Sequence, residues 1–239
     1  MTEPLLRVAD LSAGYGQQTV LNAVSLSVEP GEIVSVVGAN GAGKTTLLLT
    51  IGGHLQPTGG TVSFVGHDIT AIAAHEAAPR GLVMVPEGGR LFPFMTVLEN
   101  LELGAYHHAA RQRMGETLEE VLALFPILAE RRSQLAGRLS GGERQMCAVA
   151  RAIMSLPKLL MLDEPSLGLA PIMVDRLFEK VESLVQSKGL AVLLVEQNVG
   201  NALRLCRRGY VLDHGSVVKQ ASGAELLNDP DVQRAYLGF

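Results

Sequence analysis

The sequence predicts an α/β protein built around a mostly parallel β-sheet. Five short β-type runs recur along the chain, and most of them are apolar throughout instead of alternating with polar residues, which is typical of strands buried on both faces. Between them lie stretches in which apolar residues recur every three or four positions, as on one face of a helix. In chain order, the expected strands are the runs at 33–37, 82–85, 159–162, 191–195 and 210–212.

Helices are expected between these strands. After the first strand, the run "TLLLTI" at 46–51 starts a helix. Apolar side chains share one helix face over 146–153 and again over 177–185. The ending "DPDVQRAYLGF" indicates a short final helix.

The middle of the chain lacks the strand pattern. From "VPEGGRLFPFMT" to "RLSGGERQ" it has helical stretches near 97–105 and 116–125 instead. We therefore predict a single domain in which a helical sub-lobe at 87–156 is inserted into a sheet core formed by 1–86 and 157–239.

The composition is that of a globular protein without a basic surface. Of its 239 residues, 47% are hydrophobic and 18% are charged, and the formal net charge is −4. We therefore do not expect nucleic-acid binding. The positive charge that an anionic ligand needs must come from residues in its own binding site. Glu3 and Pro4 do not fit an export signal, and no apolar run approaches the roughly 20 residues of a membrane-spanning helix. We expect a soluble, intracellular protein.

The cysteines and histidines do not suggest a metal site. Cys147 and Cys206 lie far apart in apolar, helix-like surroundings and are expected to be buried small side chains. His107 and His108 fit a helix end or loop better than metal binding.

The segment "GANGAGKTT" at 38–46 fits the pattern G-x-x-x-x-G-K-[ST] between an expected strand and an expected helix, which is the context of a phosphate-binding loop. Glycines let several N–H groups point inward, and the new helix adds the positive end of its dipole. Lys44 would supply a full charge, and Thr45 is placed to bind Mg²⁺. The alternative is a glycine-rich turn with a capping threonine. The residues expected to contact a nucleotide are Gly38, Asn40, Gly41, Ala42, Gly43, Lys44, Thr45 and Thr46.

Two acids follow an apolar strand in "LLMLDEP". Asp163 and Glu164 are expected just beyond the end of this strand, at the sheet edge where parallel strands meet ligands. Asp163 is suited to hold the Mg²⁺ shell, and Glu164 could orient and deprotonate the water that attacks a γ-phosphate. The alternative is an acidic turn before Pro165.

A second helix start lies in "RLSGGERQMCAVARAI". Ser140 can cap this helix, and Gly141 and Gly142 leave its first amides exposed. An ordinary capped helix would explain the serine but not two adjacent glycines, each of which costs about 1 kcal/mol in a helix interior. The sequence therefore predicts a second phosphate-ready helix terminus.

These segments resemble the ATP-binding cassette (ABC) ATPases. "GANGAGKTT", "LSGGERQ" and "LLMLDEP" are similar, in this order, to their phosphate loop, signature and acidic strand. The resemblance covers essentially the whole chain and implies a P-loop NTPase fold, a RecA-like core with an antiparallel β edge. It also implies ATP hydrolysis with ATP and Mg²⁺ as cofactors, which gives Lys44 and Glu164 catalytic roles.

The same resemblance implies a head-to-tail pair of cassettes that encloses two ATP molecules. Ser140 and Gly142, with Gly141 and Glu143 beside them, would then contact the nucleotide held by the partner's phosphate loop. Tyr15, in "SAGYGQQTV", matches the aromatic residue that stacks on adenine; the alternative is a tyrosine in a turn.

Three positions depart from the family pattern. Glu87 stands where the family usually has a glutamine that senses Mg²⁺ and the attacking water; it can still bind Mg²⁺ but adds charge. Gln197 replaces a histidine that faces the γ-phosphate, and it can donate a hydrogen bond but cannot become cationic. Ala170 replaces an aspartate after "DEPSLGL". These changes could mean slow hydrolysis.

The combination of "VPEGGRLFP", "MTVLENLELG", "LDEPSLGLAP", "VEQN" and a terminal "YLG" resembles one of the two ATPases of branched-chain amino-acid importers. The implied partners are a second cassette (a sister or itself), two membrane permeases and, indirectly, an extracytoplasmic binding protein. The implied location is the cytoplasmic face of the membrane. An apolar cluster would receive the permease or pack within the sub-lobe: Leu91, Phe92, Phe94 and Met95.

Other functions are compatible with parts of this pattern. Importers of urea and amides have similar ATPases. A cassette that only clamps ATP, while its sister hydrolyses, would explain Gln197. A soluble cassette of translation or repair is not favoured, since there is no second cassette, long heptad arm or basic face.

Overall fold

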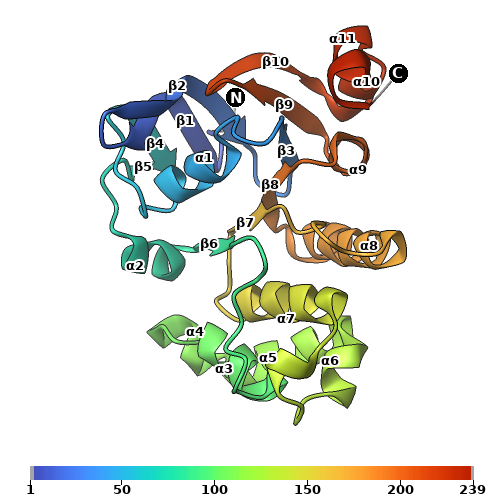
Figure 1. The fold of residues 1–239 in the computed structure, drawn as a ribbon. Helices are drawn as coiled ribbons and strands as arrows, with labels where there is room; N and C mark the ends of the chain where they lie inside the picture. Colours follow the sequence, from blue (N-terminus) through green and yellow to red (C-terminus); the bar gives the residue numbers. More distant parts are fainter. Residues whose placement is uncertain (1–2, 238–239) are drawn as a thin grey trace.

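Two β-sheets form the upper part of the molecule in Figure 1, and helices alone form its lower part. The structure is a computed structural model that describes residues 3–237. In this orientation the helical layer lies below β6 and β7 of the larger sheet. The chain segments that follow β6 and α7 connect the two parts.

The larger sheet has six strands in the order β10-β9-β3-β8-β7-β6, and only the β9–β10 pair is antiparallel. Its strands are β3 (Ile33–Val37), β6 (Leu82–Val85), β7 (Leu159–Asp163), β8 (Ala191–Glu196), β9 (Arg208–Asp213) and β10 (Ser216–Ser222). The smaller sheet is antiparallel with the order β2-β1-β4-β5. Its strands are β1 (Leu6–Tyr15), β2 (Gln18–Val28), β4 (Gly59–Phe64) and β5 (His67–Asp68).

The helices fall into those that cover the sheets and those of the lower layer. The first group is α1 (Lys44–Ile51), α2 (Ala74–Ala77), α8 (Pro171–Lys188), α9 (Val199–Leu205), α10 (Gly223–Leu227) and α11 (Pro230–Val232). The lower layer is α3 (Val97–Gly104), α4 (His108–Gln112), α5 (Met114–Leu124), α6 (Pro126–Glu130) and α7 (Gly141–Ile153). Single turns of other helix types are η1 (Ala78–Arg80), η2 (Ala136–Arg138) and η3 (Gln233–Leu237).

The parallel strands are buried on both faces because two hydrophobic cores meet at the sheet. Successive residues alternate between them: Leu160 and Leu162 join the core made with the helices α7, α8 and α9, while Leu159 and Met161 join the core made with α1 and the small sheet. This explains why these strands are mostly apolar and do not alternate with polar residues.

The five strands predicted from apolar runs are present as β3, β6, β7, β8 and β9, with ends within two residues of those expected. The predicted helices are confirmed as α1, α3, α5, α7 and α8. The predicted final helix is present as α11 and η3, and its last residues, 238–239, lie outside the described residues. The antiparallel edge is confirmed by the small sheet. That the sub-lobe comprises 87–156 stays a prediction.

Both cysteines are buried, as predicted. Burial raises the pKa of the Cys147 thiol to about 12, which leaves it unreactive. His107 caps the N-terminus of α4, and its Nε2 lies 3.0 Å from the carbonyl oxygen of Ser155, which confirms a role at a helix end. Within residues 3–237, none of the helices has the length and apolar character needed to span a membrane.

Candidate active site

The loop between β3 and α1 curls so tightly that it needs glycine. Gly43 has φ of 106°, and a Cβ there would lie 2.9 Å from Cδ2 of Leu21. A Cβ on Gly38 would lie 2.2 Å from the carbonyl oxygen of Leu212. Gly43 offers no side chain to cap α1, and the first turn of that helix contains no acidic residue, so its first N–H groups can receive an anion.

Lys44 is folded across this loop. Its Nζ donates to the carbonyl oxygens of Gly38 and Ala39, at 2.9 and 3.1 Å, and lies 3.1 Å from Oε1 of Glu164. The side chain is only 4% exposed. Two carbonyl oxygens accept two of the three N–H groups of this buried ammonium, so its third N–H can face an anion. In this structure that anion is the Glu164 carboxylate.

Asp163 and Thr45 meet at the carboxyl edge of the sheet. The Thr45 hydroxyl donates to Oδ1 of Asp163 at 3.1 Å. Asp163 is the last residue of β7, so the expectation that it lies just beyond the strand was wrong by one residue, because its backbone still pairs with Val195 of β8. Only Glu164 follows the strand.

Glu164 has a strained backbone. Its φ of 44° is unusual for a residue other than glycine, and its N–H donates to the carbonyl oxygen of Val195 at 2.9 Å. Such a conformation costs about 1–3 kcal/mol and persists where surrounding contacts enforce it, often at functional sites. Here it turns the chain out of β7 so that Asp163 and Glu164 present their carboxylates at neighbouring points.

Burial raises the pKa of Asp163 from 3.8 to about 6. The Thr45 hydrogen bond opposes this rise, and the negative charges of Glu164 and Glu87 add to it. Glu87 is therefore near enough to Asp163 to act on its charge. The two neighbouring negative charges disfavour the ionised form of Asp163, and a cation at this edge would relieve that repulsion.

Asp163→Asn is expected to stabilise the chain without nucleotide by about 2–3 kcal/mol at pH 8. A carboxyl group whose pKa rises from 3.8 to about 6 on folding destabilises the folded state when it is ionised. This destabilisation is complete above pH 6, about half as large at pH 5, and absent below 3.8. Urea unfolding at pH 8 and pH 5 measures the difference, with the exposed Asp175→Asn as control. An equal difference at both pH values would contradict the assignment.

Gln197 and Glu164 line one cleft of about 510 Å³ between β7, β8 and the start of α9. Gln197 is exposed there. Tyr15 is 51% exposed at the end of β1. It pairs with Gln18 of β2, the strand whose Val20 and Leu21 lie against Gly43, so this hairpin end is beside the phosphate loop.

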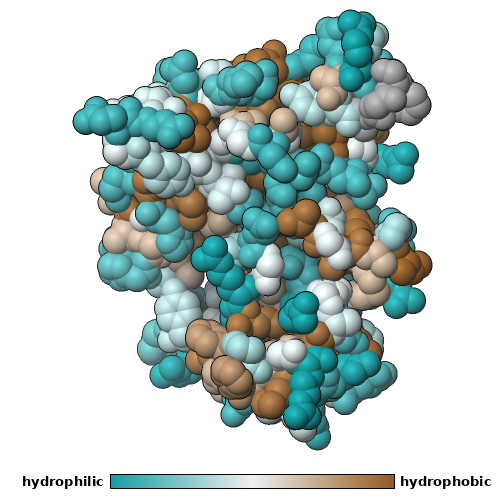
Figure 2. Space-filling view, viewed as in Figure 1, coloured by the Kyte–Doolittle hydropathy of each residue, from teal (hydrophilic) through white to brown (hydrophobic). Residues whose placement is uncertain are grey.

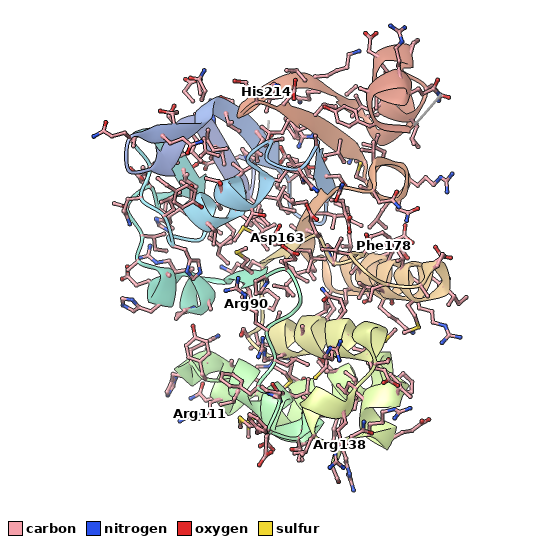
Figure 3. All side chains as sticks on the ribbon, in the orientation of Figure 1. Arg90, Arg111, Arg138, Asp163, Phe178 and His214 are labelled. Carbon is pink, nitrogen blue, oxygen red and sulfur yellow. The ribbon has the colours of Figure 1, made fainter. Side chains whose placement is uncertain are left out.

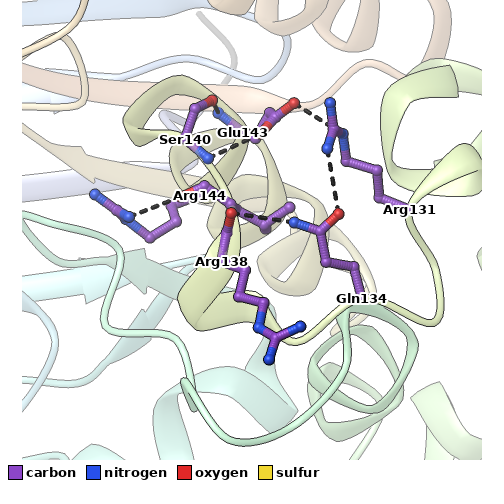
Figure 4. Close-up of polar contacts among 7 residues, drawn as sticks. Arg131, Gln134, Arg138, Ser140, Glu143 and Arg144 are labelled. Atoms are coloured by element: carbon purple, nitrogen blue, oxygen red, sulfur yellow. Dashed lines mark hydrogen bonds and ion pairs between the residues drawn. The ribbon is translucent and has the colours of Figure 1, made fainter.

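Ser140 caps α7 in a capping box (Figure 4). Glu143 N–H donates to the Ser140 hydroxyl at 3.3 Å, and Ser140 N–H donates to the Glu143 carboxylate at 2.8 Å. Arg131 Nε lies 2.9 Å from the same carboxylate. Ser140 and Gly141 are exposed, whereas the Glu143 carboxylate is engaged. The structure thus accounts for Glu143 as a capping residue, and its contact with a nucleotide stays a prediction.

Two further positions bear on the site. Glu196, buried at the end of β8, accepts a hydrogen bond from the Ser166 N–H at 2.9 Å, and burial raises its pKa. Sequence reasoning missed it, although an acid at the end of an apolar strand was the signal that found Asp163. Ala170 is the N-cap residue of α8 and has no polar side chain to cap it.

The comparisons with known proteins agree on one family. A family model described as ABC transporter matches residues 21–167. BraG of Pseudomonas aeruginosa, a high-affinity branched-chain amino acid transport ATP-binding protein, is 45% identical over 98% of this chain and 100% of its own. An ADP-bound cassette of an ABC transporter is 28% identical over the full length of both chains, with a TM-score of 0.86. A dimeric cassette bound to ADP and Pi is 26% identical over 91% of this chain and 98% of its own, with a TM-score of 0.76.

Proposed function

This chain belongs to the ABC transporter family, and from that premise we propose that it is the ATPase subunit of an importer for branched-chain amino acids. The observation that carries the ATPase function is the meeting of Lys44, Thr45, Asp163 and Glu164 at one sheet edge. The cargo rests on the 45% identity with BraG over the whole of that relative.

Lys44 and the first amides of α1 would bind the β- and γ-phosphates of ATP. The γ-phosphate carries more charge than a carboxylate and competes for Lys44 Nζ, which now contacts Glu164 at 3.1 Å. Glu164 is thereby released only when ATP is in place. Its free carboxylate can then orient a water molecule and accept its proton as the water attacks phosphorus. Substrate binding thus activates the base.

The residues at this edge suit Mg²⁺, because hydroxyl and carboxylate oxygens are the ligands that hard cations take. Thr45 and Asp163 would hold the ion, and Glu87 would contribute directly or through water. The remaining ligands would be phosphate oxygens and water, as is usual for Mg²⁺. Bound Mg²⁺ would neutralise charge that develops on the transferred phosphoryl group.

The second half of each site would come from another cassette. Ser140 and Gly141 are exposed at the start of α7, in the helical layer, whereas the phosphate loop lies in the sheet layer (Figure 1). A head-to-tail dimer, with a sister or with itself, would bring Ser140, Gly141 and Gly142 of one chain to the ATP of the other. Gln197 would donate a hydrogen bond to the γ-phosphate, and Tyr15 would stack on adenine.

The helical layer offers the surface for two membrane permeases. The lower part of Figure 2 includes apolar surface among polar residues. Phe92 and Phe94, on the segment between β6 and α3, are 52% and 91% exposed. Phe92 lines a cleft of about 300 Å³ together with Leu103 and Tyr106. Leu91, in contrast, packs against the core made with α7, α8 and α9, so within the predicted cluster the exposed phenylalanines are the residues that would receive the permease. This docking would place the chain on the cytoplasmic face of the membrane, below permeases supplied by an extracytoplasmic binding protein.

Reconstitution tests the proposed function. The chain is co-purified with its membrane partners, placed in vesicles, and assayed for ATP hydrolysis with leucine, isoleucine, valine or urea outside, together with the co-purified binding protein. Stimulation by the branched-chain amino acids supports the cargo assignment. Stimulation by urea alone would move the chain to the urea importers, and no stimulation by any of them would contradict both assignments.

A clamp that binds ATP without hydrolysing it is a second candidate, favoured by Gln197, which cannot take a proton. Glu164→Gln in this chain and the equivalent change in the sister cassette separate the two, because a clamp needs Lys44 to bind ATP but does not need the base. If this chain hydrolyses ATP for transport, its Glu164→Gln variant should reduce uptake at least about a hundredfold. Uptake that survives this change, but not the change in the sister, would favour the clamp.

A further inference from the structure

The segment after β6 makes a left-handed turn directly after Glu87. Gly88, Gly89 and Arg90 have φ of 69°, 67° and 41° in succession. Glycine adopts such angles freely, but arginine does not, so Arg90 must be held there by its surroundings. Figure 3 labels Arg90 on this segment, below Asp163 at the end of β7.

Arg151, on α7, supplies the contacts that hold the turn. Its Nη2 donates to the carbonyl oxygens of both Gly89 and Arg90, at 2.8 and 3.1 Å, and its guanidinium lies 5.8 Å from the centre of the Phe92 ring. The turn also lies close against α7, since a Cβ on Gly89 would come within 2.6 Å of Cβ of Ala148. Within the described chain Arg151 has no carboxylate at ion-pair distance, so these carbonyls are its polar partners.

The turn therefore joins two parts of the proposed machinery. On its N-terminal side is Glu87, whose charge reaches Asp163. On its other side is α7, a helix of 13 residues that begins at the Ser140 cap.

We propose that Arg151 is a positioning residue: its two hydrogen bonds to the turn at 88–90 hold Glu87 near Asp163, where the metal site is proposed. This inference rests on the proposed Mg²⁺ site at Thr45, Asp163 and Glu87, and it adds a residue that would touch neither nucleotide nor metal. It predicts that loss of Arg151 weakens the contribution of the metal to ATP binding, and not the binding of ATP itself.

The test is the ratio of ATP affinities measured with Mg²⁺ and with EDTA, using a fluorescent ATP analogue and the purified chain. Arg151→Met keeps the length and the apolar contacts of the side chain but removes its donors. We expect the ratio to fall about tenfold, as for the loss of hydrogen bonds from a charged group, with the affinity in EDTA unchanged. The control is Arg111→Met, an exposed arginine on α4 of the same layer, which should leave the ratio unchanged.

A rescue separates positioning from a general structural role. Arg90→Gly removes the strain of the left-handed residue, so the turn forms more readily without Arg151. When Arg90→Gly is combined with Arg151→Met, the ratio of affinities should therefore rise again by about threefold or more, which is half of the tenfold loss on a logarithmic scale. If Arg151→Met does not fold, Gly89→Ala, which leaves Arg151 in place but drives the turn away from Ala148, should lower the ratio in the same way.

The outcomes distinguish this inference from the function on which it rests. Suppose that Glu87→Ala lowers the ratio but Arg151→Met and Gly89→Ala do not. This result would leave the metal site standing and overturn the role of Arg151. No rescue by Arg90→Gly would also overturn it. A wild-type ratio near one would overturn the metal site itself, and no binding in EDTA or Mg²⁺ would overturn the nucleotide site.

Discussion

Glu164→Gln is expected to lower the maximal rate of ATP hydrolysis by about a hundredfold to ten-thousandfold, the range typical for loss of a general base. The amide keeps the size of the side chain but cannot accept a proton from the attacking water. Affinity for ATP should be unchanged or slightly higher, because Glu164 competes with phosphate for Lys44 in the structure. Phosphate release and nucleotide binding, measured on the same preparation, separate the two effects.

Glu179→Gln is the matched control, since this glutamate of α8 is exposed and distant in sequence from the strand ends. Hydrolysis by Glu164→Gln within tenfold of the unmodified chain would require another base. Glu196 is the nearest candidate by sequence pattern, but its carboxylate is buried and already accepts the Ser166 N–H. Cargo-stimulated hydrolysis that survives Glu164→Gln would therefore remove the proposed mechanism and not merely the residue.

The phosphate loop and the acidic strand could be predicted from sequence because their information is local. The loop needs glycine, lysine and threonine at fixed spacing between a strand and a helix, and apolar flanks identify both elements. The strands buried on both faces were visible for the same reason. Each of β3, β6, β7 and β8 is a mostly apolar run in the sequence and is placed between two cores in the structure.

The small sheet was harder to locate from the residues. β1 alternates buried and exposed positions, and its pairing with β2 is interrupted by register shifts near Leu11 and Ala13, which break the period of two. Its existence was expected only through the family resemblance. Local patterns of this kind are weak where irregular pairing and long-range contacts decide the structure.

The phosphate loop was expected to meet Asp163 and Glu164 because both motifs serve one nucleotide, but contacts between distant segments without such a motif could not be predicted. Arg151 and the turn that it holds are about 60 residues apart in the chain, and nothing near either segment specifies the other. The roles of Ser140 and Gly141 pose the same difficulty between two chains. Their exposure at the start of α7 is visible, but a single chain does not contain the partner that they would meet.

A mixture of two inactive variants should regain ATPase activity if the sites are shared head to tail. Lys44→Ala removes the cation of the phosphate loop, and Gly141→Glu places a negative charge where the partner's phosphates would lie. Gly141 has room for a side chain, since a Cβ would lie 3.7 Å from Leu169, and an acidic residue suits a helix N-terminus. Each variant alone should lose at least about a hundredfold in hydrolysis rate. Gly141→Ala controls for size.

The recovery has a defined magnitude. In an equimolar mixture that exchanges freely, half of the dimers are mixed. Each mixed dimer has one complete site, in which an intact loop faces an intact helix terminus, and one site in which both are disabled. If the sites act independently, activity should return to about one quarter of the unmodified value. If each site lay within one chain, no mixed dimer would contain a complete site and the mixture would stay inactive. With a sister cassette as partner, the two changes would disable different sites, so that each alone spares one site and only the double variant loses both. Both forms of the experiment depend on the same geometry, in which a phosphate loop and a helix terminus from different chains enclose one ATP.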